Sequence, residues 1–119
     1  MSVENESINY TKCSPDELMA LGNKAKEARE VENAIKYYLM AGKYSEETKD
    51  YKTALEAYNS AAELGCTDAM VCLGDLYNEG FACRRNPEWS LDIYRKAAYA
   101  GNADGMYGVA VACVRRFHI

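Results

Sequence analysis

The chain has 119 residues, of which 49% are hydrophobic and 27% charged, and this composition predicts one globular domain with a buried core. Only 2 Pro and 8 Gly argue against an all-β chain, and a single His nearly excludes His-based metal sites and acid–base chemistry. The net charge of −4 is uneven, because residues 1–83 hold 8 basic and 15 acidic residues, whereas residues 84–119 hold 6 and 3. We therefore expect an acidic end and a basic end.

Residues 1–12 are polar and acidic and lack the apolar segment of a signal peptide. They predict a flexible tail on a cytoplasmic protein, and no apolar run is long enough to cross a membrane. The odd number of cysteines, five, includes no CxxC pair, so we expect free thiols rather than disulfides or zinc sites.

The first predicted helix covers residues 15–28. Ser14 is suited to the N-cap, Pro15 to the first helical position, and Glu17 has the spacing of a capping box. We expect this helix to cap the N-terminal end of an array of helices that makes up a single domain over residues 13–119.

The next two predicted helices cover residues 31–44 and 50–64. The later one carries an apolar stripe of large and small residues at helical spacing: Tyr51, Ala54, Leu55, Tyr58, Ala61 and Ala62. The earlier one carries a similar stripe only 20 residues upstream: Val31, Ala34, Ile35, Tyr38 and Ala41. Both stripes have the pattern of a second helix, but first and second helices alternate in such an array, so two second helices cannot be adjacent. We therefore expect 31–44 to be a first helix that pairs with 50–64 in a repeat over 31–65.

A second repeat is predicted over residues 66–101, with helices at 67–79 and 87–100. Residues 58–71 and 94–107 match at an offset of 36, which is a period typical of helical-hairpin solenoids. Gly65 stands where a helix C-cap requires positive φ, Gly80 ends the first helix, and Pro87 suits the first turn of the second.

The last predicted helix, 102–116, is a half repeat, because the sequence ends before a second helix follows. The face expected to contact the preceding repeat contains Met106, Val109, Ala110 and Cys113. The face expected to stay partly exposed contains Tyr107, Val111, Val114 and Phe117. Solenoid ends normally need a polar cap, so this end predicts a homodimer contact, a bound partner, or a fragment of a longer array.

Three segments carry a resemblance: DYKTALEAYNSAAELG at 50–65, LGDLYNEG at 73–80 and SLDIYRKAAYAGNADGMYG at 90–108. They resemble the Sel-one-like repeat, a relative of the tetratricopeptide repeat, best over residues 50–113. Upstream, residues 18–41 are similar to the tetratricopeptide pattern. The resemblance implies an all-α fold, a short right-handed α-solenoid of antiparallel helix pairs with about six helices, and a usual role in protein–protein scaffolding.

In such solenoids the first helices line the concave face, which here corresponds to 31–44, 67–79 and 102–116. The candidate partner-binding residues on this face are Lys36, Tyr37, Lys43, Tyr44, Val71, Asp75, Asn78, Tyr107 and Arg115. Further candidates near the basic loop and the C-terminal helix are Arg84, Arg85, Trp89, Val114 and Phe117. Tyr is a frequent interface anchor, whereas Tyr58, Tyr77 and Tyr94 are expected in the core. Trp89 either packs on the loop or forms an exposed anchor.

These features predict a non-catalytic protein that binds another protein or peptide, with no cofactor and no metal. One version is an adaptor that brings partners together. The other is a small inhibitor or effector, of the kind that mobile elements or pathogens make, which occupies one target. Nucleic-acid binding through the basic end is a weaker alternative, because the whole chain is acidic, and no phosphate-binding loop occurs in the sequence.

Overall fold

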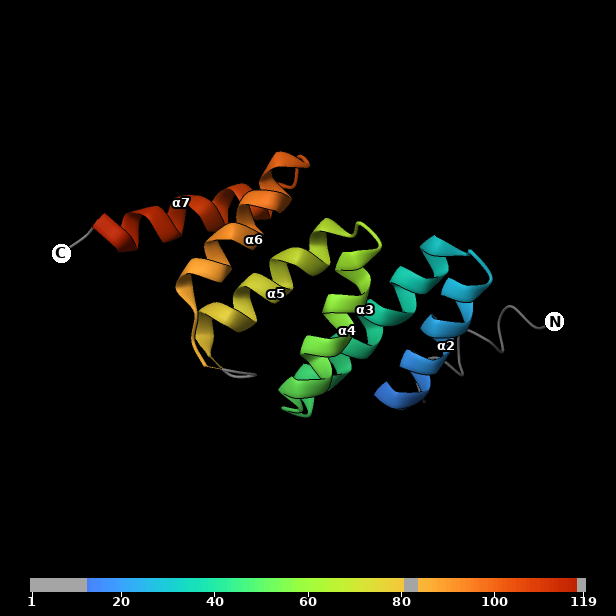
Figure 1. The fold of residues 1–119 in the computed structure, drawn as a ribbon. Coiled ribbons are helices and arrows are strands. Elements are labelled where there is room, and N and C mark those ends of the chain that lie inside the picture. The colour runs from blue at the N-terminus through green and yellow to red at the C-terminus, as the bar shows by residue number, and fades with distance from the viewer. Residues whose placement is uncertain (1–12, 81–83, 118–119) are drawn as a thin grey trace.

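Six α-helices form the described part of the chain, residues 13–80 and 84–117, in this computed structural model. They are α2 (Pro15–Glu27), α3 (Val31–Glu47), α4 (Tyr51–Glu63), α5 (Thr67–Glu79), α6 (Pro87–Tyr99) and α7 (Ala103–Phe117). Each helix packs against the next, and the array measures 58 × 28 × 22 Å with α2 and α7 at its opposite ends (Figure 1). The prediction of an all-α, solenoid-like fold is confirmed, and the expected tail over 1–12 lies outside the described residues.

The N-terminal caps follow the local sequence. Ser14 and Glu17 form a reciprocal capping box, in which each backbone N–H donates to the other side chain, at 2.8 Å and 3.2 Å. Pro87 occupies the first turn of α6, where its missing N–H leaves no helical bond unmade. A side chain at the N-cap thus satisfies an unpaired N–H group in the first turn of α2, α4 and α6, whereas α3 and α5 begin without such a bond.

Four helices, α2, α3, α4 and α6, end in the same tight turn. After each C-cap comes a residue with positive φ, and the next backbone N–H donates to the carbonyl five residues earlier, at 2.8–3.2 Å. Gly65 and Gly101 supply this conformation with φ of 95° and 93°, as expected for Gly65. Arg29 and Lys49 take it with φ of 64°, which is strained for a residue with a Cβ.

Replacement of Lys49 by glycine is expected to raise the free energy of unfolding by about 0.5–1 kcal/mol, because the left-handed conformation then carries no Cβ strain. The measurement is the midpoint of urea unfolding followed by circular dichroism. The matched control is Lys52→Gly, at an exposed position in the first turn of α4, which is expected to lose up to about 1 kcal/mol. Equal destabilisation by both variants would contradict the strain argument.

Neighbouring helices approach closely where a tyrosine ring lies against a glycine of the preceding helix. Between α3 and α4, a Cβ placed on Gly42 would lie only 2.7 Å from Cζ of the fully buried Tyr58. Only glycine admits the ring at this distance. The same arrangement recurs at two other helix pairs, with Gly22 against Tyr38 and Gly74 against Tyr94.

Each of these three rings also donates its hydroxyl to a polar side chain of the preceding helix. Burial raises the pKa of all three hydroxyls, so they remain protonated donors at neutral pH. A buried hydroxyl without an acceptor would destabilise the fold, so the acceptors belong to the docking as much as the glycines do. The acceptors are Asn23 for Tyr38, Glu46 for Tyr58, and Asp75 for Tyr94.

Helix α3 plays two roles: it pairs with α4, as expected of a first helix, and it also docks on α2. It inserts Tyr38 against Gly22 of α2, as a second helix does, and it receives Tyr58 at its own Gly42, as a first helix does. The buried residues of α3 lie on one broad face, which both neighbouring helices contact. This accounts for the short 20-residue spacing between the two stripes, because one helix docks on both of its neighbours.

Helix α7 packs on α6 through glycines, which corrects the sequence prediction. A Cβ on Gly105 would lie 2.7 Å from Cβ of Ala97, so the two backbones approach closely here. Met106 and Ala110 were expected to face the preceding repeat, but both are exposed, Met106 to 52%. The reason is that small residues allow a closer helix contact than a Met side chain does, so α7 rotates its glycine face inward.

Candidate functional site

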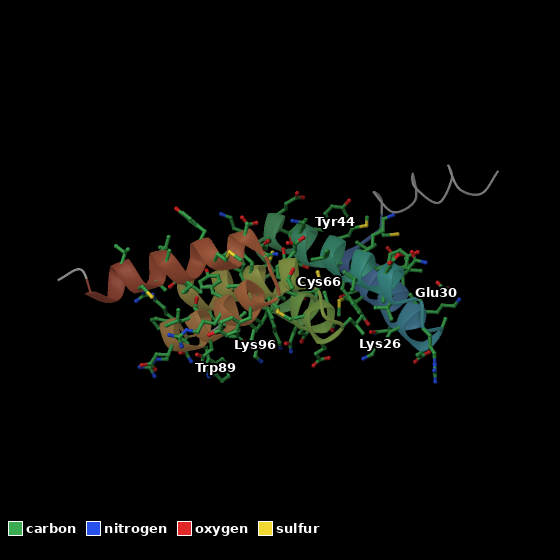
Figure 2. All side chains as sticks on the ribbon, turned by 90° about the horizontal axis from the view of Figure 1, so that it is seen from above. Lys26, Glu30, Tyr44, Cys66, Trp89 and Lys96 are labelled. Atoms are coloured by element: carbon green, nitrogen blue, oxygen red, sulfur yellow. The ribbon has the colours of Figure 1, made fainter. Side chains whose placement is uncertain are left out.

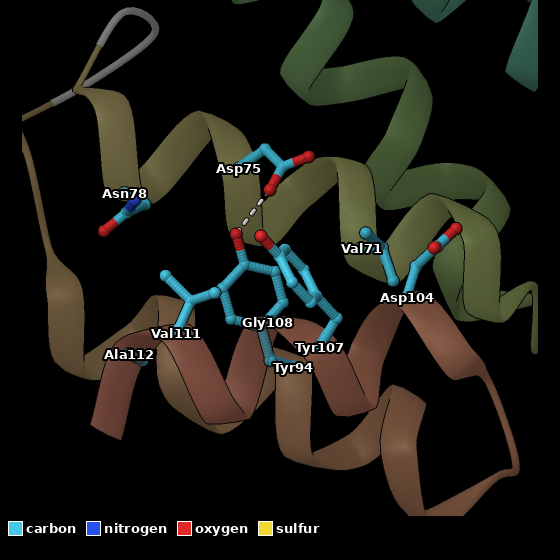
Figure 3. Close-up of a pocket in the computed structure, with 9 residues that line it drawn as sticks. All are labelled: Val71, Asp75, Asn78, Tyr94, Asp104, Tyr107, Gly108, Val111 and Ala112. Atoms are coloured by element: carbon cyan, nitrogen blue, oxygen red, sulfur yellow. Dashed lines mark hydrogen bonds between the residues drawn. The ribbon is translucent and has the colours of Figure 1, made fainter. Parts of the chain in front are cut away.

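A groove lies between α5 and α7, and the ring of Tyr94 from α6 forms its floor (Figure 3). Its volume is about 420 Å³. Helix α5 contributes Val71, Asp75 and Asn78, and α7 contributes Asp104, Tyr107, Gly108, Val111 and Ala112. Helix α6 lies between the two flanking helices in chain order and packs against both.

The floor of the groove is fixed by contacts on both sides of Tyr94. A Cβ on Gly74 would lie 2.6 Å from Cε1 of the ring, and a Cβ on Gly108 would lie 2.7 Å from its Cγ. The Tyr94 hydroxyl donates to Oδ1 of Asp75, which orients the carboxylate over the groove (Figure 3). The ring is thus held between α5 and α7 and defines their separation.

Asn102, the residue before α7, ties the start of α7 to the start of α5. Its Oδ1 accepts the backbone N–H of Gly105 at 3.0 Å and so caps the helix. Its Nδ2 donates to Oγ1 of Thr67 at 3.0 Å and to Oδ1 of Asp68 at 2.8 Å, both at the start of α5. One side chain therefore caps α7 and ties its first turn to the first turn of α5.

Asn102→Ala is expected to lower the free energy of unfolding by about 2 kcal/mol, because it removes an N-cap and the bridge to α5 together. The matched control is Asn86→Ala in α6, since Asn86 caps through the Trp89 N–H at 3.1 Å. We expect the control to lose about 1 kcal/mol. The measurement is urea unfolding, and equal losses for the two variants would show that the bridge contributes nothing.

The groove carries negative charge. Although Asp75 is exposed, partial loss of hydration in the groove raises the pKa of its carboxyl. The Tyr94 hydroxyl opposes this shift by donating to the carboxyl, and the nearby carboxylates of Glu46 and Asp104 reinforce it. Among the side chains that the structure describes, no Lys or Arg forms an ion pair with Asp75 or Asp104. The groove therefore offers carboxylates without a cationic partner, which is the environment that a positively charged ligand group would occupy.

Asp75→Asn is expected to be at least as stable as the original protein at neutral pH. The pKa of Asp75 is higher in the folded protein than in the unfolded chain, so folding favours the protonated carboxyl. The original protein therefore loses this part of its stability as the pH rises through the folded pKa, whereas the asparagine variant has no carboxyl to ionise. The asparagine Oδ1 still accepts the Tyr94 hydroxyl. The measurement is the difference in urea unfolding midpoint between pH 3 and pH 7. If the original protein gains stability relative to the variant as pH rises, the proposed desolvation is wrong.

Four of the predicted contact residues come together in this groove: Val71, Asp75, Asn78 and Tyr107. The four predicted on α3 do not join them. Lys36 and Lys43 are exposed, whereas Tyr37 is half-buried beside α2 and Tyr44 is half-buried against the core cluster around Leu18. Val114 is exposed on another face of α7, and the side chains of Arg115 and Phe117 lie outside the described residues.

The remaining predicted residues lie near α6. Trp89 is 56% exposed and meets Tyr77 edge-on, with ring centroids 5.3 Å apart, so it both packs and presents a surface. It borders a hollow of about 470 Å³ with Asp92, Ile93, Arg95, Lys96 and Tyr99. Arg84 is exposed, and Arg85 donates from Nε to the Asn78 carbonyl at 2.8 Å. Trp89 and Lys96 lie along one long edge of the molecule, opposite Tyr44 (Figure 2).

Sequence reasoning missed three residues of the groove region: Tyr94, Asp104 and Asn102. Tyr94 is expected in the core from its position on the apolar stripe, and its ring is indeed buried, but the ring also forms the floor of the groove. Asp104 and Asn102 had a signal in the 36-residue offset, which pairs them with Asp68 and with the N-cap Cys66. The offset indicates that α5 and α7 begin with similar residues, but it does not show that Asn102 at the start of α7 bonds to Thr67 and Asp68 at the start of α5.

None of the cysteines that the structure describes lines the groove. Burial raises the pKa of the Cys72 thiol to about 11, so at neutral pH the thiol is protonated and unreactive. Cys66 and Cys113 are half-buried free thiols. No group of three His, Cys, Asp or Glu residues in the described part of the chain is arranged to hold a metal ion.

Comparison of the sequence with protein-family models, with curated proteins and with solved structures found no match. The resemblance to the Sel-one-like repeat therefore stays a prediction. Within residues 13–80 and 84–117, no helix is long and apolar enough for a membrane span.

Proposed function

We propose that this protein is a non-catalytic protein-binding module, and that the groove between α5 and α7 takes a basic segment of its partner. One observation carries the proposal: Val71, Asp75 and Asn78 of α5 and Tyr107 of α7 line one hollow. A solenoid face of this kind suits a peptide, because successive repeats supply successive side-chain contacts.

The chemistry of the groove suits a lysine or arginine side chain flanked by an apolar one. Asp75 and Asp104 supply negative charge, and Tyr107, 73% exposed, presents a ring that can cover a cation. Val71 and Val111 supply apolar walls. A volume of about 420 Å³ holds a few side chains rather than a whole protein element, so the partner inserts only a short segment.

The negative charge of the groove disfavours nucleic acid there, since phosphates would meet carboxylates. The hollow beside Trp89 shares no residue with the groove and has Arg95 and Lys96 on its border. The groove is acidic, whereas the second hollow has two basic residues on its border. Two surfaces that differ in charge in this way favour an adaptor over an inhibitor that occupies a single target, and the second experiment below distinguishes the two.

The test is selection of binding peptides from a random displayed library with the whole protein as bait. We expect peptides rich in Lys or Arg, and we expect the double variant Asp75→Asn, Asp104→Asn to bind them at least about tenfold more weakly. The matched control is Asp92→Asn, which removes a carboxylate from the other hollow. Neutral or acidic selected peptides, or a loss only with Asp92→Asn, would reject the groove as the site.

The adaptor and inhibitor versions are separated by capture from the native cell extract. Charge reversal of Arg95 and Lys96 and the double groove variant should each remove a different co-purifying protein if the chain is an adaptor. Loss of the same single protein by both sets of changes would favour the inhibitor.

A further inference from the structure

The outward face of α7 is apolar along its described length. Ala103, Met106 and Ala110 are exposed and Cys113 is half-buried, so apolar residues recur at alternating steps of three and four. Val114, 65% exposed, borders the same line. This spacing is the seam of a helix that pairs with another helix. We call the line formed by residues 103, 106, 110 and 113 the α7 seam.

A further helix of the kind that builds this array does not fit the α7 seam. At the three sites where a tyrosine docks, the receiving residue is a glycine. The 36-residue offset places Ala110 of α7 at the position that Gly74 has in α5. A Cβ on Gly74 would lie 2.6 Å from the Tyr94 ring, so the Cβ of Ala110 would obstruct a tyrosine that docked on α7 in the same way. The hydroxyl acceptor Asp75 is likewise replaced by Val111, which accepts nothing. The occupant of the seam must therefore pack without a tyrosine.

A second copy of α7 fits the seam in an antiparallel arrangement centred on Ala110. Met106 of one copy then lies across from Val114 of the other, and the small Ala110 residues meet at the two-fold axis. Charge agrees with this direction, because α7 begins with Asp104 in its first turn and its sequence ends in VRRF. Antiparallel pairing sets each acidic first turn beside a basic last turn and opposes the two helix dipoles.

We propose that the protein forms a homodimer by antiparallel pairing of the α7 seams, with Ala110 at the two-fold axis. This inference is independent of the groove, which lies on another face of α7. The helix is 15 residues long, or about 22 Å, so the contact is smaller than a standard interface. We therefore expect a weak dimer whose population rises with concentration over the micromolar range.

The test is sedimentation velocity on the full chain and on Ala110→Glu and Ala110→Lys, alone and mixed in equal amounts. The original protein should shift from monomer toward dimer as concentration rises. Each charged variant should stay monomeric, because identical charges would meet at the axis. The equimolar mixture should regain the dimer, because Glu then faces Lys.

Asn59→Glu and Asn59→Lys, at an exposed position on α4, serve as controls and should dimerise like the original protein. Circular dichroism of all variants checks that they fold, and the exposure of Ala110 predicts that they do. A mixture of Ala110 variants that stays monomeric would overturn the two-fold arrangement. So would an original protein that stays monomeric at the highest concentration, or one whose mass grows beyond a dimer.

Discussion

Tyr94→Ala is expected to lower the free energy of unfolding by about 3–5 kcal/mol, a large part of the stability of an ordinary domain. The ring is only 6% exposed and fills the space between Gly74 of α5 and Gly108 of α7. Its loss leaves a cavity that three helices share, and the glycines offer no side chains to fill it. Urea unfolding followed by circular dichroism measures the loss.

The matched variant Tyr94→Phe separates the ring from its hydroxyl. It keeps the packing and removes only the hydrogen bond to Asp75, so we expect a loss of about 1 kcal/mol. Hydrogen exchange should show α7 losing protection in Tyr94→Ala but not in Tyr94→Phe. Similar stability of the two variants would mean that the ring does not hold α5 and α7 together.

Gly42→Ala is expected to destabilise the protein by about 2–3 kcal/mol, because a Cβ there would lie 2.7 Å from Cζ of Tyr58. The Tyr58 ring cannot move away from the added methyl group, because it is fully buried and its hydroxyl donates to Oε1 of Glu46 at 2.5 Å. Chemical denaturation gives the loss. The control is Gly65→Ala, because nothing lies within 4 Å of a Cβ at this position. Only the positive φ of residue 65 disfavours alanine, so we expect the free energy of unfolding to fall by about 1 kcal/mol.

A double-mutant cycle tests the steric origin of this effect. In a Tyr58→Leu background the smaller side chain leaves room for the new methyl group, so Gly42→Ala should destabilise by at least about 1 kcal/mol less than it does in the original protein. Additive losses would place the effect of Gly42→Ala elsewhere, for example in local helix propensity, and would contradict the docking of the ring.

The helices were predictable because their signals are local. Ser14 and Glu17 form the expected capping box, Gly65 takes the expected positive φ, and the helix expected over 67–79 spans Thr67–Glu79. Apolar periodicity identified most of the buried residues of α4 and α6, but it missed the buried Ala57 and Ser90. These features depend on neighbours within about four residues, and the order of the residues alone contains them.

The relative rotation of the helices was not predictable in the same way. Tyr38 and Gly42 lie on one helix, and nothing in their spacing shows that one inserts into α2 while the other receives Tyr58. On α7, Met106 has the apolar character of a core residue, yet Gly105 makes the contact with α6. Which of several apolar faces turns inward depends on the shape of the neighbour, so Asp104 and Tyr94 were missed as parts of the groove.

The double role of α3 also shapes how the molecule comes apart. Because α3 docks into α2 and receives α4, these three helices should unfold as one cooperative unit. Helices α5, α6 and α7 are joined in the same way through Tyr94 and Asn102. The contact between α4 and α5 is the least extensive between consecutive helices, so the boundary of cooperativity falls there. Both the groove and the α7 seam belong to the second unit, so a ligand bound at either would stabilise that half directly, while the first half would gain only what the α4–α5 contact transmits.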